Sequence, residues 1–167
     1  MGTCLHVRHA GIGLVVAPCV ETHDETIRLC YATATRKASR RLTALYDEVM
    51  APSGLRSTQF AILGELAHAT SLTINELAEL LVMDRSALGH SLRPLQRDGL
   101  ISLDKDTTDR RSVNVSLTRE GRRRFTKATV LWNAAQERVE SALGLTQADR
   151  LRTKLLGIAT DDRLTTP

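Results

Sequence analysis

Basic and short polar side chains gather on one segment in the middle of the chain. They recur at helical spacing beside leucines that would face inward, and the candidates are Arg85, Ser86, His90 and Arg93. A helix that carries such side chains near its N-terminus fits the major groove of duplex DNA, roughly 12 Å wide, where they reach base edges and phosphates. The segment is therefore a candidate DNA-contacting helix, and the alternative is the solvated face of an ordinary amphipathic helix.

Two further arginines, Arg110 and Arg111, lie in the polar stretch 104–112 between two apolar segments. At a hairpin tip, a guanidinium can enter a narrow minor groove, where the negative potential is enhanced. Asp109 is better explained as an ion-pair partner that positions one of these arginines, because a carboxylate beside phosphate is repelled. Either arginine could be the one that enters the groove.

Positive charge is concentrated in this part of the chain. Residues 84–127 carry 11 Lys and Arg against 6 Asp and Glu, whereas the formal net charge of the whole chain is +4. This distribution fits a polyanionic partner. For the basic run Arg119, Arg122, Arg123 and Arg124, a solvated helix face is favoured over contact with flanking DNA backbone.

Catalytic and metal-binding patterns are missing from the sequence. It has no G-x-S-x-G, no phosphate-binding glycine loop and no H-E-x-x-H, and its five histidines are scattered. We therefore expect no enzymatic activity, no metal and no cofactor. The three cysteines, Cys4, Cys19 and Cys30, lack C-x-x-C spacing, which favours a reducing cytoplasm over a disulfide framework. Cys30 is interpreted either as a small core residue or as a redox-sensing thiol.

Residues 1–20 are interpreted as an N-terminal extension. Their apolar stretch, 11–20, is too short to span a bilayer, and it lacks a basic start and a clear A-x-A cleavage site. A weak secretory leader is the alternative. No association with a membrane is expected.

Capping residues and apolar periodicity predict the elements that would position these side chains. A long amphipathic helix over 22–50 opens with a capping-box pair at Thr22 and Glu25, and a second helix covers 57–70. Thr73 and Glu76 predict a short third helix, and Asp84 caps a fourth that ends at Asp98-Gly99. Two short helices joined by a tight turn form a helix-turn-helix pattern.

Two short strands, 100–103 and 113–117, flank the polar tip, and a long helix over 118–143 follows. Thr146 and Asp149 predict the cap of a last helix that runs to about 159. The predicted fold is mainly α with a small β-hairpin wing.

This order of elements, together with three stretches, resembles the MarR family of bacterial regulators. The stretches are Leu77-Ala78-Glu79 leading into Asp84-Arg85-Ser86-Ala87-Leu88, Leu92-Arg93-Pro94-Leu95-Gln96-Arg97-Asp98-Gly99-Leu100-Ile101, and Asp109-Arg110-Arg111-Ser112 running to Leu117-Thr118. The last resembles the family's Asp-x-Arg wing motif and points to Arg111 as the motif arginine. The resemblance covers about 30–159 and leaves the first twenty residues outside.

The resemblance implies a winged helix-turn-helix over about 55–118 within a domain of 21–167. It also implies that helices over about 22–50 and 118–160 interlock two subunits, because they carry more apolar positions than one small module needs. The homodimer would read an inverted repeat in double-stranded DNA as a cytoplasmic transcriptional regulator, expected to be a repressor.

The resemblance further implies a small effector, typically an aromatic acid or a phenol, bound between the dimerisation helices and the DNA-binding lobe. Binding there would weaken the affinity for DNA. Candidate ligand-binding residues combine anion-pairing or aromatic character with the right helices, and they are Arg36, Arg40, Tyr46, Gln59, Phe60 and Trp132. Two alternatives stay open: an oxidation sensor that uses Cys30, and a winged-helix module that binds proteins without DNA.

Overall fold

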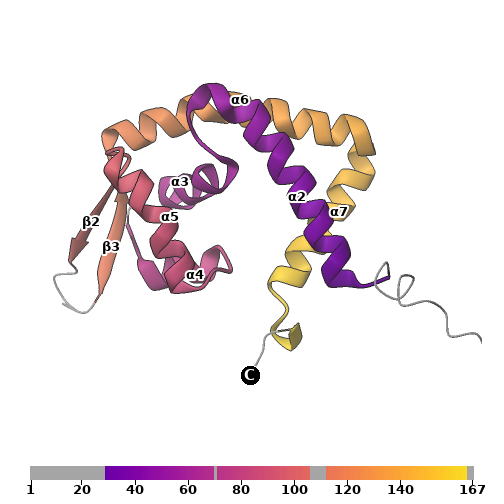
Figure 1. The fold of residues 1–167 in the computed structure, drawn as a ribbon, viewed down its shortest axis with the longest axis horizontal. Helices are drawn as coiled ribbons and strands as arrows, with labels where there is room; N and C mark the ends of the chain where they lie inside the picture. Colours follow the sequence, from indigo (N-terminus) through magenta and orange to yellow (C-terminus); the bar gives the residue numbers. More distant parts are fainter. Residues whose placement is uncertain (1–28, 70, 106–111, 165–167) are drawn as a thin grey trace, which may run out of the picture. The chain divides into compact units, whose positions relative to one another are not determined.

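The computed structural model describes residues 29–69, 71–105 and 112–164. The chain divides into two units, Met1–Ala38 and Ser39–Pro167, and helix α2 crosses their boundary. The elements in chain order are α2 (Tyr31–Met50), the 3-10 turn η1 (Ala51–Ser53), α3 (Ser57–His68), β1 (Leu72–Thr73), α4 (Ile74–Leu80), α5 (Arg85–Arg97), β2 (Ile101–Lys105), β3 (Val113–Leu117), α6 (Arg119–Leu143), α7 (Leu145–Ala159) and η2 (Asp162–Leu164) (Figure 1). This confirms the predicted mainly α fold with a small β wing.

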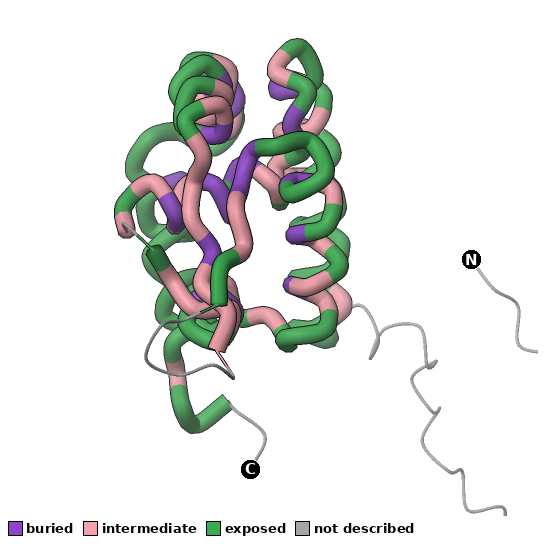
Figure 2. The backbone as a smooth tube through the Cα atoms, turned by 90° about the vertical axis from the view of Figure 1, so that its left-hand side faces the viewer, coloured by how far each residue is buried: buried purple, intermediate pink, exposed green. Residues whose placement is uncertain are grey.

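The hydrophobic core of the second unit lies among α3, α4, α5 and the sheet. Leucines supply most of it, because each helix turns one apolar stripe inward. Leu63, Leu77, Leu88, Leu95 and Val115 are completely buried. In Figure 2 the buried positions recur at intervals along the helices, separated by exposed ones.

Side-chain caps begin both helices of the helix-turn-helix, as the sequence predicts. The backbone N–H of Thr73 donates to Glu76 Oε2 (2.7 Å), and the Glu76 N–H donates back to Thr73 Oγ1 (3.2 Å). Asp84 Oδ1 accepts from the Ala87 N–H (2.8 Å). Between the helices, Val82 has a left-handed backbone with φ of +51°, which is strained for a β-branched residue.

The sheet has a third strand that the sequence analysis missed. Its order is β1-β3-β2, all antiparallel, with Leu72 opposite Val115 and Leu103 opposite Val115 on the other side. A two-residue strand has no alternating pattern to detect. β3 has the predicted bounds, whereas β2 begins one residue later than predicted and runs on to Lys105.

Two helix starts differ from the prediction. Helix α2 begins at Tyr31, where the Cys30 carbonyl accepts the N–H of Ala34 (3.0 Å); the expected capping pair Thr22 and Glu25 lies outside the described residues. Helix α7 begins at Leu145 after Gly144, with no side-chain cap, so the capping box expected at Thr146 and Asp149 is wrong. Asp149 instead pairs with Arg152 on the next turn, at 2.7 Å.

None of the helices in the described ranges combines the length and the apolar character needed to cross a membrane.

Candidate nucleic-acid interface and aromatic cavity

Helix α5 presents one apolar and one polar face. Its inner face buries Leu88, Leu92 and Leu95, and Asp84 caps its first turn. Because the leucines occupy the inward stripe, the four predicted contact residues remain exposed on the outer face: Arg85, Ser86, His90 and Arg93. The structure therefore brings these four together on the second helix of the helix-turn-helix.

The cations on this outer face lack carboxylate partners. Arg93 Nη1 lies 3.4 Å from His90 Nδ1, and neither Arg85 nor Arg93 forms an ion pair with any described residue. Arg97, at the end of the helix, is paired with Asp98 at 2.9 Å. Free guanidinium groups at the beginning and middle of the helix can donate to phosphates or base edges.

The predicted wing residues Asp109, Arg110 and Arg111 lie outside the described residues. The flanking strands are described up to the pair Lys105 and Val113.

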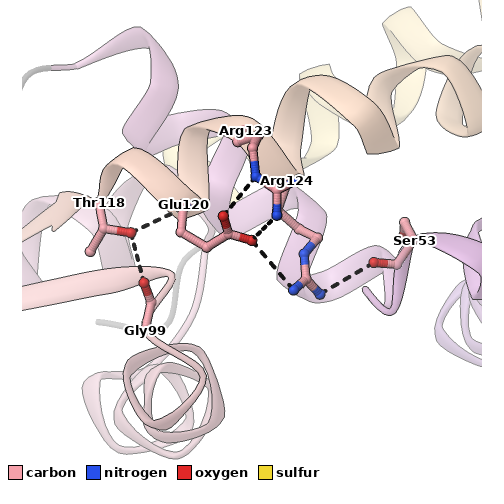
Figure 3. Close-up of polar contacts among 7 residues, drawn as sticks. Ser53, Gly99, Thr118, Glu120, Arg123 and Arg124 are labelled. Carbon is pink, nitrogen blue, oxygen red and sulfur yellow. Dashed lines mark hydrogen bonds and ion pairs between the residues drawn. The ribbon is translucent and has the colours of Figure 1, made fainter.

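The start of α6 is fastened to neighbouring elements (Figure 3). Thr118 Oγ1 accepts from the Gly121 N–H (3.0 Å) and donates to the Gly99 carbonyl (2.7 Å). Gly121 lies so close to the segment between α5 and β2 that a Cβ built on it would be 1.9 Å from the Leu100 carbonyl oxygen. Only a residue without a side chain permits this approach.

Two arginines of the α6 basic run are held by protein groups. Arg123 forms a two-pronged contact with Glu120, at 2.7 and 2.6 Å, and Arg124 lies 3.6 Å from the same carboxylate. Arg124 also donates to the carbonyl of Ser53 (3.5 Å). Hydrogen bonding from Arg123 lowers the pKa of Glu120. Arg119 and Arg122 remain exposed.

A cavity of about 650 Å³ opens beside α3 and α6. Three rings form its aromatic wall: Phe60 stacks on Phe125, with ring centroids 4.8 Å apart, and on Trp132, at 5.9 Å. Ten residues line it, namely Tyr46, Ser57, Phe60, Ala61, Gly64, Glu65, His68, Phe125, Thr129 and Trp132. A planar apolar ring fits such a wall, because offset-stacked aromatic pairs are favourable.

Of the predicted ligand residues, Tyr46, Phe60 and Trp132 lie together around this cavity. Gln59 does not line it; its Oε1 accepts the Arg56 N–H (2.9 Å) at the start of α3. Arg40 is exposed on α2 and does not line it either, and Arg36 is exposed in the unit Met1–Ala38.

Sequence reasoning missed other cavity residues, above all Glu65, His68 and Phe125. Helical spacing contained this information, since Ala61, Gly64, Glu65 and His68 recur at three- and four-residue steps along α3. Polar members of that stripe were not recognised as part of a site, because an amphipathic pattern assigns polar residues to solvent.

Tyr46, on α2, lines the cavity and is hydrogen-bonded to a side chain of α6. Its hydroxyl donates to Gln136 Oε1 of α6. Burial, with a smaller contribution from the Glu140 carboxylate, raises the pKa of Tyr46. The phenol is therefore neutral and its hydrogen is committed to Gln136.

Cys30 is exposed and stands immediately before α2. A hydrogen bond from the backbone of Thr33 lowers the pKa of the Cys30 thiol, with further contributions from the Thr33 side chain and the Ala32 backbone. Such a thiol forms thiolate more readily than an ordinary one.

Comparisons with known proteins agree with this architecture. The profile of the MarR family matches residues 55–113. The transcriptional activatory protein BadR of Rhodopseudomonas palustris is 35% identical over a segment that covers 41% of this chain and 41% of that protein. The HTH-type transcriptional repressor MdtR of Bacillus subtilis is 30% identical over 69% of this chain and 76% of that protein. The chain belongs to the MarR family.

Solved structures of transcriptional regulators share the fold of this MarR-family chain. MosR of M. tuberculosis, a transcriptional regulator crystallised in complex with DNA, matches with a TM-score of 0.71 and 32% identity, over 78% of this chain and 93% of that chain. The chain spans about half the length of the first curated relatives that it matches.

Proposed function

We propose that this MarR-family protein is a sequence-specific regulator of transcription that inserts helix α5 into the major groove of duplex DNA. The observation that carries the proposal is the exposed face of α5, on which Arg85 and Arg93 have no carboxylate partner among the described residues while the opposite face is buried. Arginine in this position reads guanine or binds phosphate. A relative of 32% identity, MosR, was crystallised with DNA.

The decisive experiment uses the intergenic DNA upstream of the chain's own gene. Footprinting should reveal protection of an inverted repeat, and binding should weaken steeply as salt rises. Absence of salt-sensitive duplex binding would contradict the proposal and favour the alternative of a module that binds other proteins.

The proposal includes a symmetric homodimer held by the terminal helices. Apolar side chains on α7 are left without cover in the single chain, with Leu145 72%, Leu156 60% and Ile158 59% exposed. A second copy would bury this apolar surface and hold two α5 helices about one duplex turn apart. Light scattering should show a dimer, and a folded monomer at micromolar concentration would contradict this part.

The wing forms a second proposed contact with DNA. Arg110 or Arg111 enters the minor groove, and Asp109 braces one of them through an ion pair. We expect Arg111→Ala to weaken operator binding while base preference inside the half-sites is kept. Selection of bound sequences from a random pool measures both quantities.

The aromatic cavity is proposed as the effector site of a cytoplasmic repressor. A small aromatic ligand bound beside Phe60 and Trp132 would contact both α3 of the DNA-binding part and α6, and so bias the position of one against the other. Ligand should release the protein from its operator in a mobility-shift assay and raise expression of a reporter gene. Ligand-independent repression would contradict the effector role.

A second candidate function rests on Cys30. Its exposure and lowered thiol pKa suit oxidation, and an organic hydroperoxide resistance regulator of Bacillus subtilis is 30% identical over 84 residues. Loss of DNA binding on treatment with an organic hydroperoxide, absent in Cys30→Ser, would support it. Equal sensitivity of the two proteins would exclude Cys30 as the sensor.

A further inference from the structure

The polar groups around the aromatic cavity are unequally divided between hydrogen-bond donors and acceptors. Three hydroxyls line it, and each has committed its hydrogen to a protein acceptor outside the cavity wall or in the backbone. Ser57 Oγ donates to Asp47 Oδ1 (2.7 Å), Thr129 Oγ1 donates to the Phe125 carbonyl (3.0 Å), and Tyr46 donates to Gln136. These hydroxyls can therefore offer a ligand only acceptor lone pairs.

The charged lining of the cavity is also acceptor-rich. Glu65 carries the one carboxylate among the ten lining residues, and it forms no ion pair with any described residue. Arg and Lys do not occur among those ten residues. Two side chains of the lining can still donate: His68, one turn further along α3, through one ring nitrogen when neutral, and Trp132 through its indole N–H.

The aromatic wall also favours a positively charged ligand. Phe60, Phe125 and Trp132 line the cavity, and the quadrupole of an aromatic ring attracts a cation placed over its face, most strongly for Trp. A ring with a protonated amine can stack on this wall and place its ammonium near Glu65. A carboxylate in the same place meets an unpaired carboxylate and acceptor oxygens.

We propose that the cavity selects an aromatic amine in its cationic form and discriminates against aromatic carboxylates. The inference rests on the proposed effector role only for its regulatory consequence, because ligand selection itself follows from the lining. The family resemblance led us to expect an aromatic acid or a phenol, and the inference departs from the aromatic acid. The anion-pairing residues in that expectation, Arg36 and Arg40, are not part of the cavity wall.

The test compares three ligands of similar size that differ in charge: phenethylamine, phenylethanol and phenylacetate. Trp132 is the only tryptophan of the chain and lines the cavity, so its fluorescence reports occupancy directly. Titration of the full-length protein near neutral pH should give an affinity for phenethylamine at least about tenfold above that for phenylacetate, with phenylethanol between them.

Charge variants locate the selectivity. Glu65→Gln keeps the shape and removes the charge, so the affinity for phenethylamine should fall about tenfold while that for phenylethanol stays unchanged. Glu137→Gln, an exposed carboxylate on α6 outside the cavity, is the matched control and should bind all three ligands as the wild type does. Circular dichroism verifies that both variants are folded.

A second variant tests the site without altering charge. Gly64 lines the cavity, and a Cβ there would lie in ordinary contact with Phe125 at 3.6 Å. Gly64→Met places a side chain in the cavity against Phe125 and should weaken the binding of all three ligands at least about tenfold. Wild-type affinity for phenethylamine in Gly64→Met would overturn the assignment of the ligand to this cavity.

Two results would overturn the selectivity: phenylacetate binding as tightly as phenethylamine, or no change of emission with any ligand. Binding to operator DNA is measured on the same samples. If phenethylamine binds through Glu65 but leaves the DNA complex intact, the inference stands and the effector role fails. If phenylacetate both binds more tightly and releases DNA, the effector role stands and the inference fails.

Discussion

The outer face of α5 and the start of α6 are both rich in arginine, yet the structure treats their charges differently. On α5, Arg85 and Arg93 are exposed and have no carboxylate partner within the described residues. On α6, Glu120 holds Arg123 and Arg124, and the Ser53 carbonyl accepts from Arg124 (Figure 3). The number of basic residues therefore does not distinguish the two surfaces. They differ in how many of the guanidinium groups are already paired with protein groups.

The backbone of α6 is also packed more tightly against its neighbours than that of α5, as one glycine in each helix shows. Gly121 at the start of α6 is pressed against the Leu100 carbonyl, whereas a Cβ on Gly89 in α5 would meet nothing within 4 Å. The start of α6 is fixed by its close packing against Leu100, the residue that precedes β2. Helix α5 keeps one face available for a partner.

The largest expected effect comes from Gly121→Ala. Because its Cβ would fall 1.9 Å from the Leu100 oxygen, the backbone must shift, and we expect the free energy of unfolding to drop by about 3 kcal/mol. Gly89→Ala is the matched control and should raise it by about 0.5–1 kcal/mol, since alanine favours a helix. Denaturant unfolding measures both, and equal effects would contradict the contrast between the two helix glycines.

Next in size is the loss of DNA affinity in Arg93→Ala. Removing a guanidinium that contacts a base edge or phosphate should cost about 1–3 kcal/mol of binding free energy. Arg123→Ala, in which an engaged arginine is removed, should bind operator within about twofold of wild type. If Arg123→Ala weakens binding more than Arg93→Ala does, the start of α6 is the contact surface and Arg119 and Arg122 become the next residues to test.

A smaller effect should appear in the salt dependence. Each phosphate neutralised contributes a slope of about −0.9 to the plot of log affinity against log salt concentration. Arg85→Ala should make that slope shallower by about one such unit, while Arg123→Ala should leave it unchanged. Identical slopes for wild type and Arg85→Ala would exclude a phosphate contact at Arg85.

The smallest expected effect concerns Glu120. Arg123 lowers its pKa in the folded protein, so its contribution to stability is present above the ordinary pKa of glutamate and is lost as the pH falls through the lowered value. In Arg123→Ala the pKa of Glu120 should rise toward its ordinary value. An NMR titration of the side-chain carboxyl carbon would record this, and an unchanged pKa would show that Arg123 does not engage Glu120 in solution.

Features that depend on residues close together in the sequence could be predicted from the sequence alone. The caps at Thr73, Asp84 and Thr118 all act on an amide three residues further along, so neighbouring residues suffice to recognise them. The same holds for the leucine stripe of α5 and for the alternation of β3. Thr146 shows the limit: its pattern is typical of a cap, but α7 already begins at Leu145, directly after Gly144.

Contacts between distant parts of the chain needed the tertiary structure. The strand β1 exists because Leu72 meets Val115, and the bond from Tyr46 to Gln136 joins residues ninety positions apart. The close approach of Gly121 to Leu100, the commitment of Ser57 to Asp47 and the convergence of Phe60 with Phe125 and Trp132 likewise depend on how helices pack. Residue types and spacing determined which helix could face DNA. Only the packing decided which cations stay unpaired among the described residues and which side chains line the aromatic cavity, because these contacts join residues that are far apart in the sequence.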